Sequence, residues 1–109
     1  MKKILMVDDD RDFCEATALF LESKGYQVTL AHDGKDGLKK TRAQKPDLVI
    51  LDVMMPEMNG YDVCVVIKAD PELKNIPVIL LTGVGEAVFK TTYSKHMGLM
   101  TEADDYLAK

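Results

Sequence analysis

Five side chains that could bind a metal ion or a phosphate stand where apolar runs of the sequence end: Asp8, Asp9, Asp52, Thr82 and Lys109. In an open parallel sheet, ligands gather at the carboxyl ends of the strands, near the point where the strand order reverses. If the apolar runs are strands of one such sheet, these side chains all lie at one edge of it. We therefore expect them to converge despite their separation along the chain.

Asp8, Asp9 and Asp52 would bring three carboxylates into one pocket. Like charges a few ångströms apart repel strongly in a partly desolvated site, so either a cation lies among them or some are protonated. Oxygen ligands with positions left open for water and phosphate suit Mg²⁺ or Mn²⁺ rather than zinc. The alternative is that the acids at 8–10 only cap the following helix. Capping accounts for one of them, Asp9 or Asp10, and leaves Asp52 unexplained.

Asp52 ends the apolar run 48–51, and the chain then leaves in a loop. An aspartate in this place can attack a phosphoryl donor and form an acyl phosphate. Such a transfer depends mostly on positioning and charge neutralisation, for which a metal, a hydroxyl donor and a lysine suffice. Thr82 and Lys109 are of these types. Taken singly, however, a threonine at a strand end is ordinary and a terminal lysine is commonly just solvated.

The apolar runs are continuous rather than alternating, which is typical of parallel strands with both faces covered by helices. We predict strands at 4–7, 28–31, 48–51 and 76–81, and a weaker one at 106–108. Helical segments alternate with them, so the order of elements predicts a single α/β domain with right-handed crossovers.

Capping residues and helix breakers mark the helices between these strands. For the first helix we expect Asp9 or Asp10 as the cap and Gly25 as the stop, and for the second Asp33 as the cap and an end before Pro46. The third is expected to begin at Asn59-Gly60 and to end at Asp70-Pro71, and a fourth is expected from Glu86 to about Met97. The inward faces expected are Phe13, Ala16, Phe20 and Leu21 for the first helix and Val63, Cys64 and Ile67 for the third.

Composition limits the function classes. A chain of 109 residues that is 47% hydrophobic can bury one core. It has no apolar run of the roughly 18 residues that span a membrane and no signal-peptide pattern at its start, so we expect a cytoplasmic location and no membrane partner. Cys14 and Cys64 fit free, buried thiols. A net charge of −4 argues against direct nucleic-acid binding by this domain.

Four segments together resemble the receiver domain of two-component response regulators, and the resemblance covers essentially the whole chain. They are residues 4–10, 51–60, 80–83 and 103–109, which read ILMVDDD, LDVMMPEMNG, LLTG and ADDYLAK. Each motif alone is weak, whereas all four in this order at strand ends form a specific combination. The resemblance implies a flavodoxin-like, doubly wound parallel sheet of five strands in the order 2-1-3-4-5.

The resemblance also implies roles for the acidic residues. Asp52 would accept a phosphoryl group from a sensor histidine kinase or a histidine phosphotransfer protein. Asp8 and Asp9 would hold Mg²⁺ with help from Asp52 and the backbone carbonyl of Met54. The protein would then be a phosphorylation-dependent switch rather than an enzyme, acting through an output domain or downstream protein that the sequence does not identify.

In the family, residues matching Thr82 and Lys109 bind the phosphoryl oxygens, and Tyr106 resembles the rotating switch aromatic. Gly83 stands where alanine is common. The stretch between Thr82 and Lys109 is a few residues longer than usual. Family members continue beyond the lysine with a proline and a fifth helix, so we expect residues 1–109 to be a receiver domain shortened before its last helix, with exposed apolar surface. A second copy of the chain is therefore a further candidate partner.

Three other interpretations compete with the receiver. A metal-dependent phosphatase with an aspartyl nucleophile would share the first half-reaction, but the sequence has no DxD pair at Asp52, which Val53 and Met54 follow. A degenerate receiver that only binds proteins is disfavoured because all five chemical residues are present. A dinucleotide-binding domain is disfavoured because no GxGxxG follows the first strand.

Two finer expectations concern exposed side chains. Val65 and Val66 should face outward from the third helix, because the inward set there is 63, 64 and 67. Met54 and Val84 match the positions that flank the path of the attacking water in the family. Neither can orient a water molecule, so we expect slow loss of the phosphoryl group.

Overall fold

Five parallel strands form one sheet in the order β2-β1-β3-β4-β5. The computed structural model describes residues 1–82 and 103–108. The strands are β1 (Lys3–Val7), β2 (Gln27–Ala31), β3 (Leu48–Asp52), β4 (Val78–Thr82) and β5 (Asp105–Ala108). Each predicted apolar run is a strand, and the predicted strand order is confirmed. The fourth strand begins two residues later than expected, after Pro77.

Among residues 1–82 and 103–108, three helices connect strands: α1 (Arg11–Ser23), α2 (Gly34–Gln44) and α3 (Gly60–Ala69). Each begins after a predicted capping residue, because the side chains of Asp10, Asp33 and Asn59 accept hydrogen bonds from backbone N–H groups of the first turn. Gly25 follows α1 with a φ of 94°, a conformation that glycine adopts at little cost. The helix expected from Glu86 lies outside the described residues.

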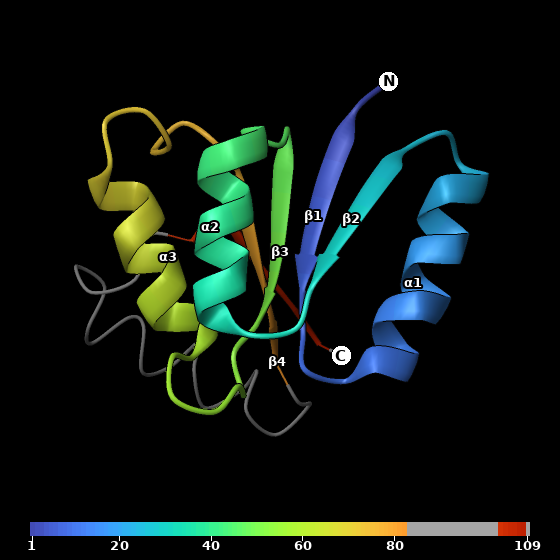
Figure 1. Ribbon diagram of the computed structural model, residues 1–109, viewed down its shortest axis with the longest axis horizontal. Coiled ribbons are helices and arrows are strands. Elements are labelled where there is room, and N and C mark those ends of the chain that lie inside the picture. Colours follow the sequence, from blue (N-terminus) through green and yellow to red (C-terminus); the bar gives the residue numbers. More distant parts are fainter. Residues whose placement is uncertain (83–102, 109) are drawn as a thin grey trace.

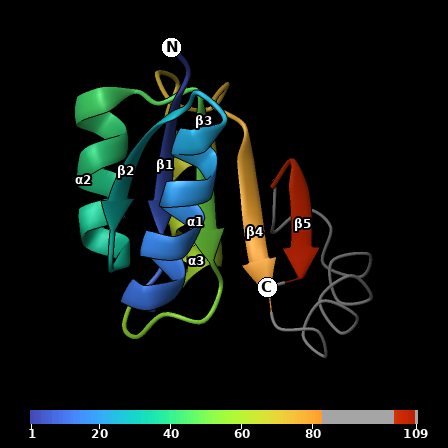
Figure 2. The same ribbon diagram turned by 90° about the vertical axis from the view of Figure 1, so that its right-hand side faces the viewer.

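The helices cover the two faces of the sheet unequally. Helices α2 and α3 lie side by side on one face and α1 lies on the other (Figures 1 and 2). The larger apolar cluster lies under α2 and α3, and it includes Leu5, Leu51 and Ile67. The smaller cluster, under α1, consists of Met6, Cys14 and Leu81 with half-buried neighbours. No helix in the described part of the chain is long and apolar enough to cross a membrane.

The expected inward face of α1 is wrong in part. Its buried residues are Cys14 and Ala18, whereas Phe20 is 61% exposed and Ala16 is exposed. The prediction followed the helical spacing of Phe13, Ala16, Phe20 and Leu21, but the buried positions of α1 hold the small residues Cys14 and Ala18. Lys24 instead lies over the Phe20 ring, 5.5 Å from its centre.

The third helix follows its prediction more closely. Val63, Cys64 and Ile67 are fully buried, and both cysteines of the chain are buried thiols that form no disulfide, as expected. Val65 faces outward and is 49% exposed. The same expectation for Val66 is wrong, because its half-buried side chain packs against the larger cluster. It lies one helical turn after Val63 and so shares the edge of the inward face.

Candidate metal centre at the carboxyl end of the sheet

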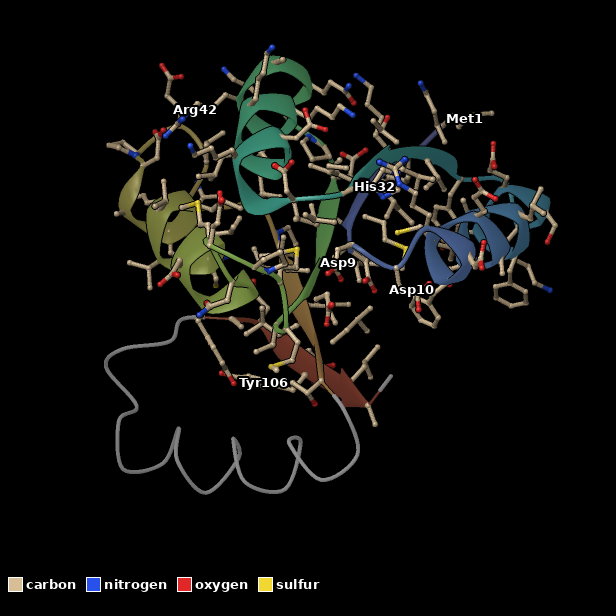
Figure 3. The ribbon with its side chains drawn as sticks, turned by 60° about the horizontal axis from the view of Figure 1, so that its bottom comes forward. Met1, Asp9, Asp10, His32, Arg42 and Tyr106 are labelled. Atoms are coloured by element: carbon tan, nitrogen blue, oxygen red, sulfur yellow. The ribbon has the colours of Figure 1, made fainter. Side chains whose placement is uncertain are left out.

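The acidic residues that the sequence singles out meet at one end of the sheet. One carboxylate oxygen from each of Asp8, Asp9 and Asp52 lies within 4.8 Å of the other two. Strands β1 and β3 are parallel neighbours with Val7 opposite Leu51, so the residues that follow these two come side by side. Asp8 is completely buried and Asp52 is 4% exposed, whereas Asp9 is exposed. Figure 3 shows Asp9 between the end of β1 and Asp10. The cluster is therefore open to solvent on one side.

Asp8 is held by hydrogen bonds on its backbone and on its side chain. Its N–H donates to the Ala31 carbonyl at 3.0 Å, and its Oδ1 accepts from the Asp10 N–H at 2.9 Å. Its carbonyl oxygen lies 3.0 Å from His32 Nδ1 and accepts from Cys14 Sγ at 3.4 Å. The neighbouring β2 strand and the start of α1 thus both fix this residue.

Asp10 has a different task from its two neighbours. Its Oδ1 accepts a hydrogen bond from the Phe13 N–H at 3.1 Å, which makes it the N-cap of α1. Of the two capping candidates, the structure selects Asp10. Asp9 is thereby left to the acidic cluster.

Asp52 is held from the side of α3. Its Oδ1 accepts from the Met54 N–H at 3.3 Å, and the next residue is tied to the sheet because the Val53 N–H donates to the Leu81 carbonyl at 3.0 Å. The first residue of α3, Gly60, packs directly on the Asp52 backbone, where a Cβ would overlap the carbonyl oxygen of Asp52. From the sequence we expected Asn59-Gly60 only to open a helix. Its second role, a close approach to the acidic residue, was missed.

Thr82 ends β4 beside the cluster, one residue beyond the partner of Asp52 in the strand register. Its side chain is fully buried, and its Oγ1 has no hydrogen-bond partner among residues 1–82 and 103–108. A buried hydroxyl left without a partner costs free energy unless a ligand satisfies it. This observation fits a site that accepts an oxygen-rich group.

The remaining predicted site residues are less completely described. Lys109 lies outside the described residues, although Ala108 before it pairs with Thr82 in the sheet. Tyr106 is half-buried and packs against the larger cluster. The Met54 side chain is 63% exposed, and the metal-binding role of its carbonyl remains a prediction.

The donor set fits a hard divalent cation. It consists of carboxylate oxygens without sulfur or imidazole ligands, and two of its three members are buried where their charges are poorly solvated. Mg²⁺ prefers such oxygen ligands and retains several water molecules, for which the exposed side around Asp9 leaves room. The residues present therefore fit the Mg²⁺ that the sequence predicts.

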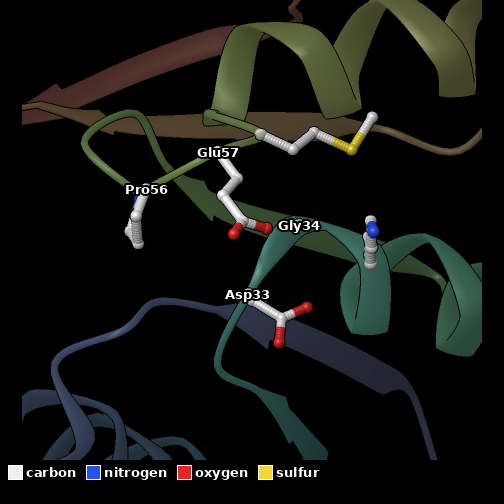
Figure 4. Close-up of a pocket in the computed structure, with 6 residues that line it drawn as sticks. Asp33, Gly34, Pro56 and Glu57 are labelled. Carbon is white, nitrogen blue, oxygen red and sulfur yellow. The ribbon is translucent and has the colours of Figure 1, made fainter.

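A pocket on the same side of the molecule as α2 is separate from the metal centre. It has a volume of about 300 Å³ and lies between the start of α2 and the loop after β3 (Figure 4). Its lining residues are Asp33, Gly34, Lys35, Pro56, Glu57 and Met58. None of the three clustered acids lines it, so it does not belong to the metal centre.

Comparison with known proteins gives the family. The response regulator receiver domain model matches residues 4–109. The alkaline phosphatase synthesis transcriptional regulatory protein PhoP of Bacillus subtilis is 39% identical over 108 residues, which cover 99% of this chain and 42% of that protein. A putative response regulator from Chloroflexus aurantiacus is 34% identical with a TM-score of 0.86, over 99% of this chain and 84% of that one.

A third relative bears on the metal. The receiver domain of the sensor histidine kinase PA1611 from Pseudomonas aeruginosa is 29% identical with a TM-score of 0.82, covering 99% of this chain and 84% of that one, and its crystal structure has a magnesium ion coordinated in the active-site cleft. The chain described here belongs to the response regulator receiver domain family, whose members are phosphorylation-dependent switches of two-component systems. It spans less than half the length of the curated relatives it matches, such as PhoP at 42%.

Proposed function

We propose that Asp52 accepts a phosphoryl group from the phosphohistidine of a histidine kinase or a histidine phosphotransfer protein, and that the chain turns over no substrate of its own. The observation that carries this proposal is the convergence of Asp8, Asp9 and Asp52 within 4.8 Å at the end of the sheet. In the transfer, a carboxylate oxygen of Asp52 forms a bond to phosphorus while the phosphorus–nitrogen bond of the donor breaks. The electron pair of that bond returns to the imidazole.

The carboxylates of Asp8, Asp9 and Asp52, with the carbonyl of Met54, would hold Mg²⁺, which neutralises the acidic cluster so that an anionic phosphoryl group can approach. Asp8 is suited to this role because hydrogen bonds at its N–H, its carbonyl and its Oδ1 fix it before any ion arrives. Asp9 reaches the cluster from the exposed side.

Thr82 and Lys109 complete the proposed site by binding the phosphoryl oxygens. Support for Thr82 comes from its buried hydroxyl, which has no partner in the described part of the chain. We further propose that Tyr106, which pairs with Leu80 two residues before the end of β4 at Thr82, changes its packing with the phosphorylation state. In this way a charge change at Asp52 would reach the surface of β5.

The test separates the metal ligands from the helix cap. Mg²⁺ is titrated calorimetrically into the wild type and into the Asp9→Ala and Asp10→Ala variants, followed by beryllofluoride as a stand-in for the phosphoryl group. Asp9→Ala should weaken Mg²⁺ binding by at least tenfold, whereas Asp10→Ala should mainly lower the free energy of unfolding, by about 1 kcal/mol. Equal losses of Mg²⁺ affinity in the two variants would contradict the division of roles.

The lifetime of the phosphorylated state is a second expected property. Met54 lies two residues after the proposed phosphoryl acceptor, in the loop after β3, and is 63% exposed; its apolar side chain can shield the site but cannot orient water. Met54→Asn should therefore lose its phosphoryl group faster than the wild type when decay is followed in Mg²⁺. A Met54→Leu variant serves as the apolar control. If Met54→Asn loses its phosphoryl group at the wild-type rate, Met54 does not control the access of water. The companion position, Val84, lies outside the described residues.

A further inference from the structure

The carbonyl oxygen of Asp8 receives two donors from different elements. His32 Nδ1, in the segment between β2 and α2, lies 3.0 Å from it, and Cys14 Sγ, in α1, lies 3.4 Å from it. Neither residue belongs to the proposed metal or phosphoryl ligands. Figure 3 shows His32 at the same end of the sheet as Asp9.

The peptide geometry gives this carbonyl a particular importance. The Asp8 carbonyl and the Asp9 N–H belong to one planar peptide unit, so fixing the carbonyl fixes the orientation of the whole plane. That plane joins the two acidic residues that reach the cluster from β1. A donor to the Asp8 carbonyl therefore restrains the relative positions of both carboxylates at once.

The two donors differ in strength. An imidazole N–H at 3.0 Å is a full hydrogen bond, whereas a thiol is a weak donor and its contact is longer, at 3.4 Å. Because a carbonyl can only accept, the hydrogen must lie on Nδ1 of His32. Cys14 is fully buried in the smaller cluster and contributes chiefly by packing.

We propose that His32 is a positioning residue of the metal centre: its Nδ1–H holds the peptide between Asp8 and Asp9 so that both carboxylates are aimed at the ion before it binds. This inference rests on the proposed function, because it takes the two acids as Mg²⁺ ligands. Groups that orient metal ligands without touching the metal typically change its affinity by about 10- to 100-fold when they are removed. His32 acts here through the backbone rather than through a ligand side chain.

The experiment compares His32→Ala, His32→Leu and His32→Asn with the wild type by calorimetric Mg²⁺ titration. Alanine and leucine remove the donor, and leucine retains most of the volume. The amide nitrogen of asparagine can occupy about the position of the imidazole Nδ1, so it can restore the hydrogen bond. We expect Mg²⁺ to bind about tenfold more weakly to His32→Ala and His32→Leu, and His32→Asn to recover most of the wild-type affinity.

Two outcomes of the titration would overturn the inference. One is wild-type Mg²⁺ affinity in His32→Ala, and the other is a loss in His32→Asn as large as in His32→Ala. A purely structural role would lower the urea midpoint of every variant without the rescue of Mg²⁺ affinity by asparagine. The Asp9→Ala variant distinguishes the two possible failures. If it binds Mg²⁺ like the wild type, the proposed function fails, whereas a loss of Mg²⁺ affinity in Asp9→Ala with none in His32→Ala contradicts the role of His32 alone.

A measurement on the unmodified protein keeps the inference testable if a variant does not fold. The ¹⁵N chemical shifts of the His32 ring, at a pH where the ring is neutral, distinguish the two tautomers. We expect the hydrogen on Nδ1, as donation to the Asp8 carbonyl requires. The tautomer with its hydrogen on Nε2 would contradict the inference.

Discussion

The two faces of the sheet are covered to different extents, although the strands between them are apolar on both sides. Under α2 and α3, the described residues form a cluster of fourteen buried apolar side chains. The smaller cluster under α1 has three buried members, and Phe13, Leu30 and Ile50 beside it are only half-buried. A groove of about 420 Å³ along this second face is lined by apolar residues that include Leu21, Leu48 and Ile79.

The acidic cluster draws support from both faces. Asp52 is held from the crowded face, where Gly60 packs on its backbone. The carbonyl of Asp8 is held by Cys14, from the sparsely covered face, and by His32. The stability of the domain and the geometry of the site therefore depend on partly separate regions. Substitutions can therefore test the two independently.

Replacing one apolar side chain of α3 and one of α1 should change the free energy of unfolding by very different amounts. Ile67→Ala leaves a cavity under α3, where the side chain is fully buried, and should lower the free energy of unfolding by about 2 to 5 kcal/mol. Phe20→Ala, on α1, removes a side chain that is 61% exposed and should change it by less than about 0.5 kcal/mol. Urea unfolding followed by circular dichroism measures both. Similar losses would mean that the two faces contribute equally.

Gly60 links the crowded face to the site through its contact with the Asp52 backbone. Gly60→Ala should lower the free energy of unfolding by about 1 to 3 kcal/mol and weaken beryllofluoride binding, because the added Cβ forces the Asp52 backbone to shift. Gly25→Ala is the matched control. Its φ of 94° is unfavourable for alanine, with a cost of about 1 kcal/mol, but no atom lies within 4 Å of the added Cβ and the site is remote. Equal effects of both variants on beryllofluoride binding would contradict the contact with Asp52.

Two adjacent valines of α3, Val65 and Val66, test where the buried face of this helix ends. Val66→Arg should cost about 1 to 2 kcal/mol because the side chain packs against the larger cluster. Val65→Arg should cost less than about 0.5 kcal/mol because that side chain is 49% exposed. Chemical denaturation of the two variants measures the difference. If Val65→Arg instead abolishes phosphoryl transfer from a kinase while folding normally, Val65 belongs to a contact surface.

The smallest effect concerns an ion pair that ties α3 to the start of β5. The Lys68 ammonium donates to Asp104 Oδ2 at 2.8 Å and holds the pKa of that carboxyl below its usual range, with help from the Val78 N–H. Since the folded-state pKa is lowered, the pair stabilises the protein above about pH 4, and this contribution is lost as the pH falls through the folded-state pKa. The effect is small because the Asp104 side chain is half-exposed.

The measurement is the urea midpoint between about pH 5.5 and pH 3 for the wild type and for Asp104→Asn. The wild type should lose more stability than the variant over this range, because only its carboxyl can be protonated. Parallel curves would show that the ion pair does not contribute.

Much of this fold could be predicted because its signals are local. The apolar runs identify the strands, and Asp10, Asp33 and Asn59 mark helix starts by hydrogen bonds that reach three residues along the chain. The convergence of the acids followed from the general rule that parallel strands end at one edge of a sheet. These inferences needed no knowledge of side-chain packing.

The rest depends on contacts between distant segments. The inward face of α1 carries the buried Cys14 and Ala18, whereas the sequence offered a larger aromatic at Phe20, which is exposed. The hydrogen bond between His32 and Asp8 joins residues 24 positions apart, and no periodicity or motif signals it. In the sequence, Gly60 stands out only because it follows Asn59, and an Asn-Gly dipeptide is explained more simply as the start of a helix.

The role of Asp52 as the Mg²⁺-dependent phosphoryl acceptor can be tested directly. The wild type and Asp52→Asn are treated with acetyl phosphate, with and without Mg²⁺, and their intact mass is measured. We expect the wild type to gain one phosphoryl group per chain only when Mg²⁺ is present, because the acidic cluster must be neutralised first. Asp52→Asn should gain none while unfolding at a urea concentration close to that of the wild type. Labelling of Asp52→Asn to the same stoichiometry, or Mg²⁺-independent labelling of the wild type, would contradict the account.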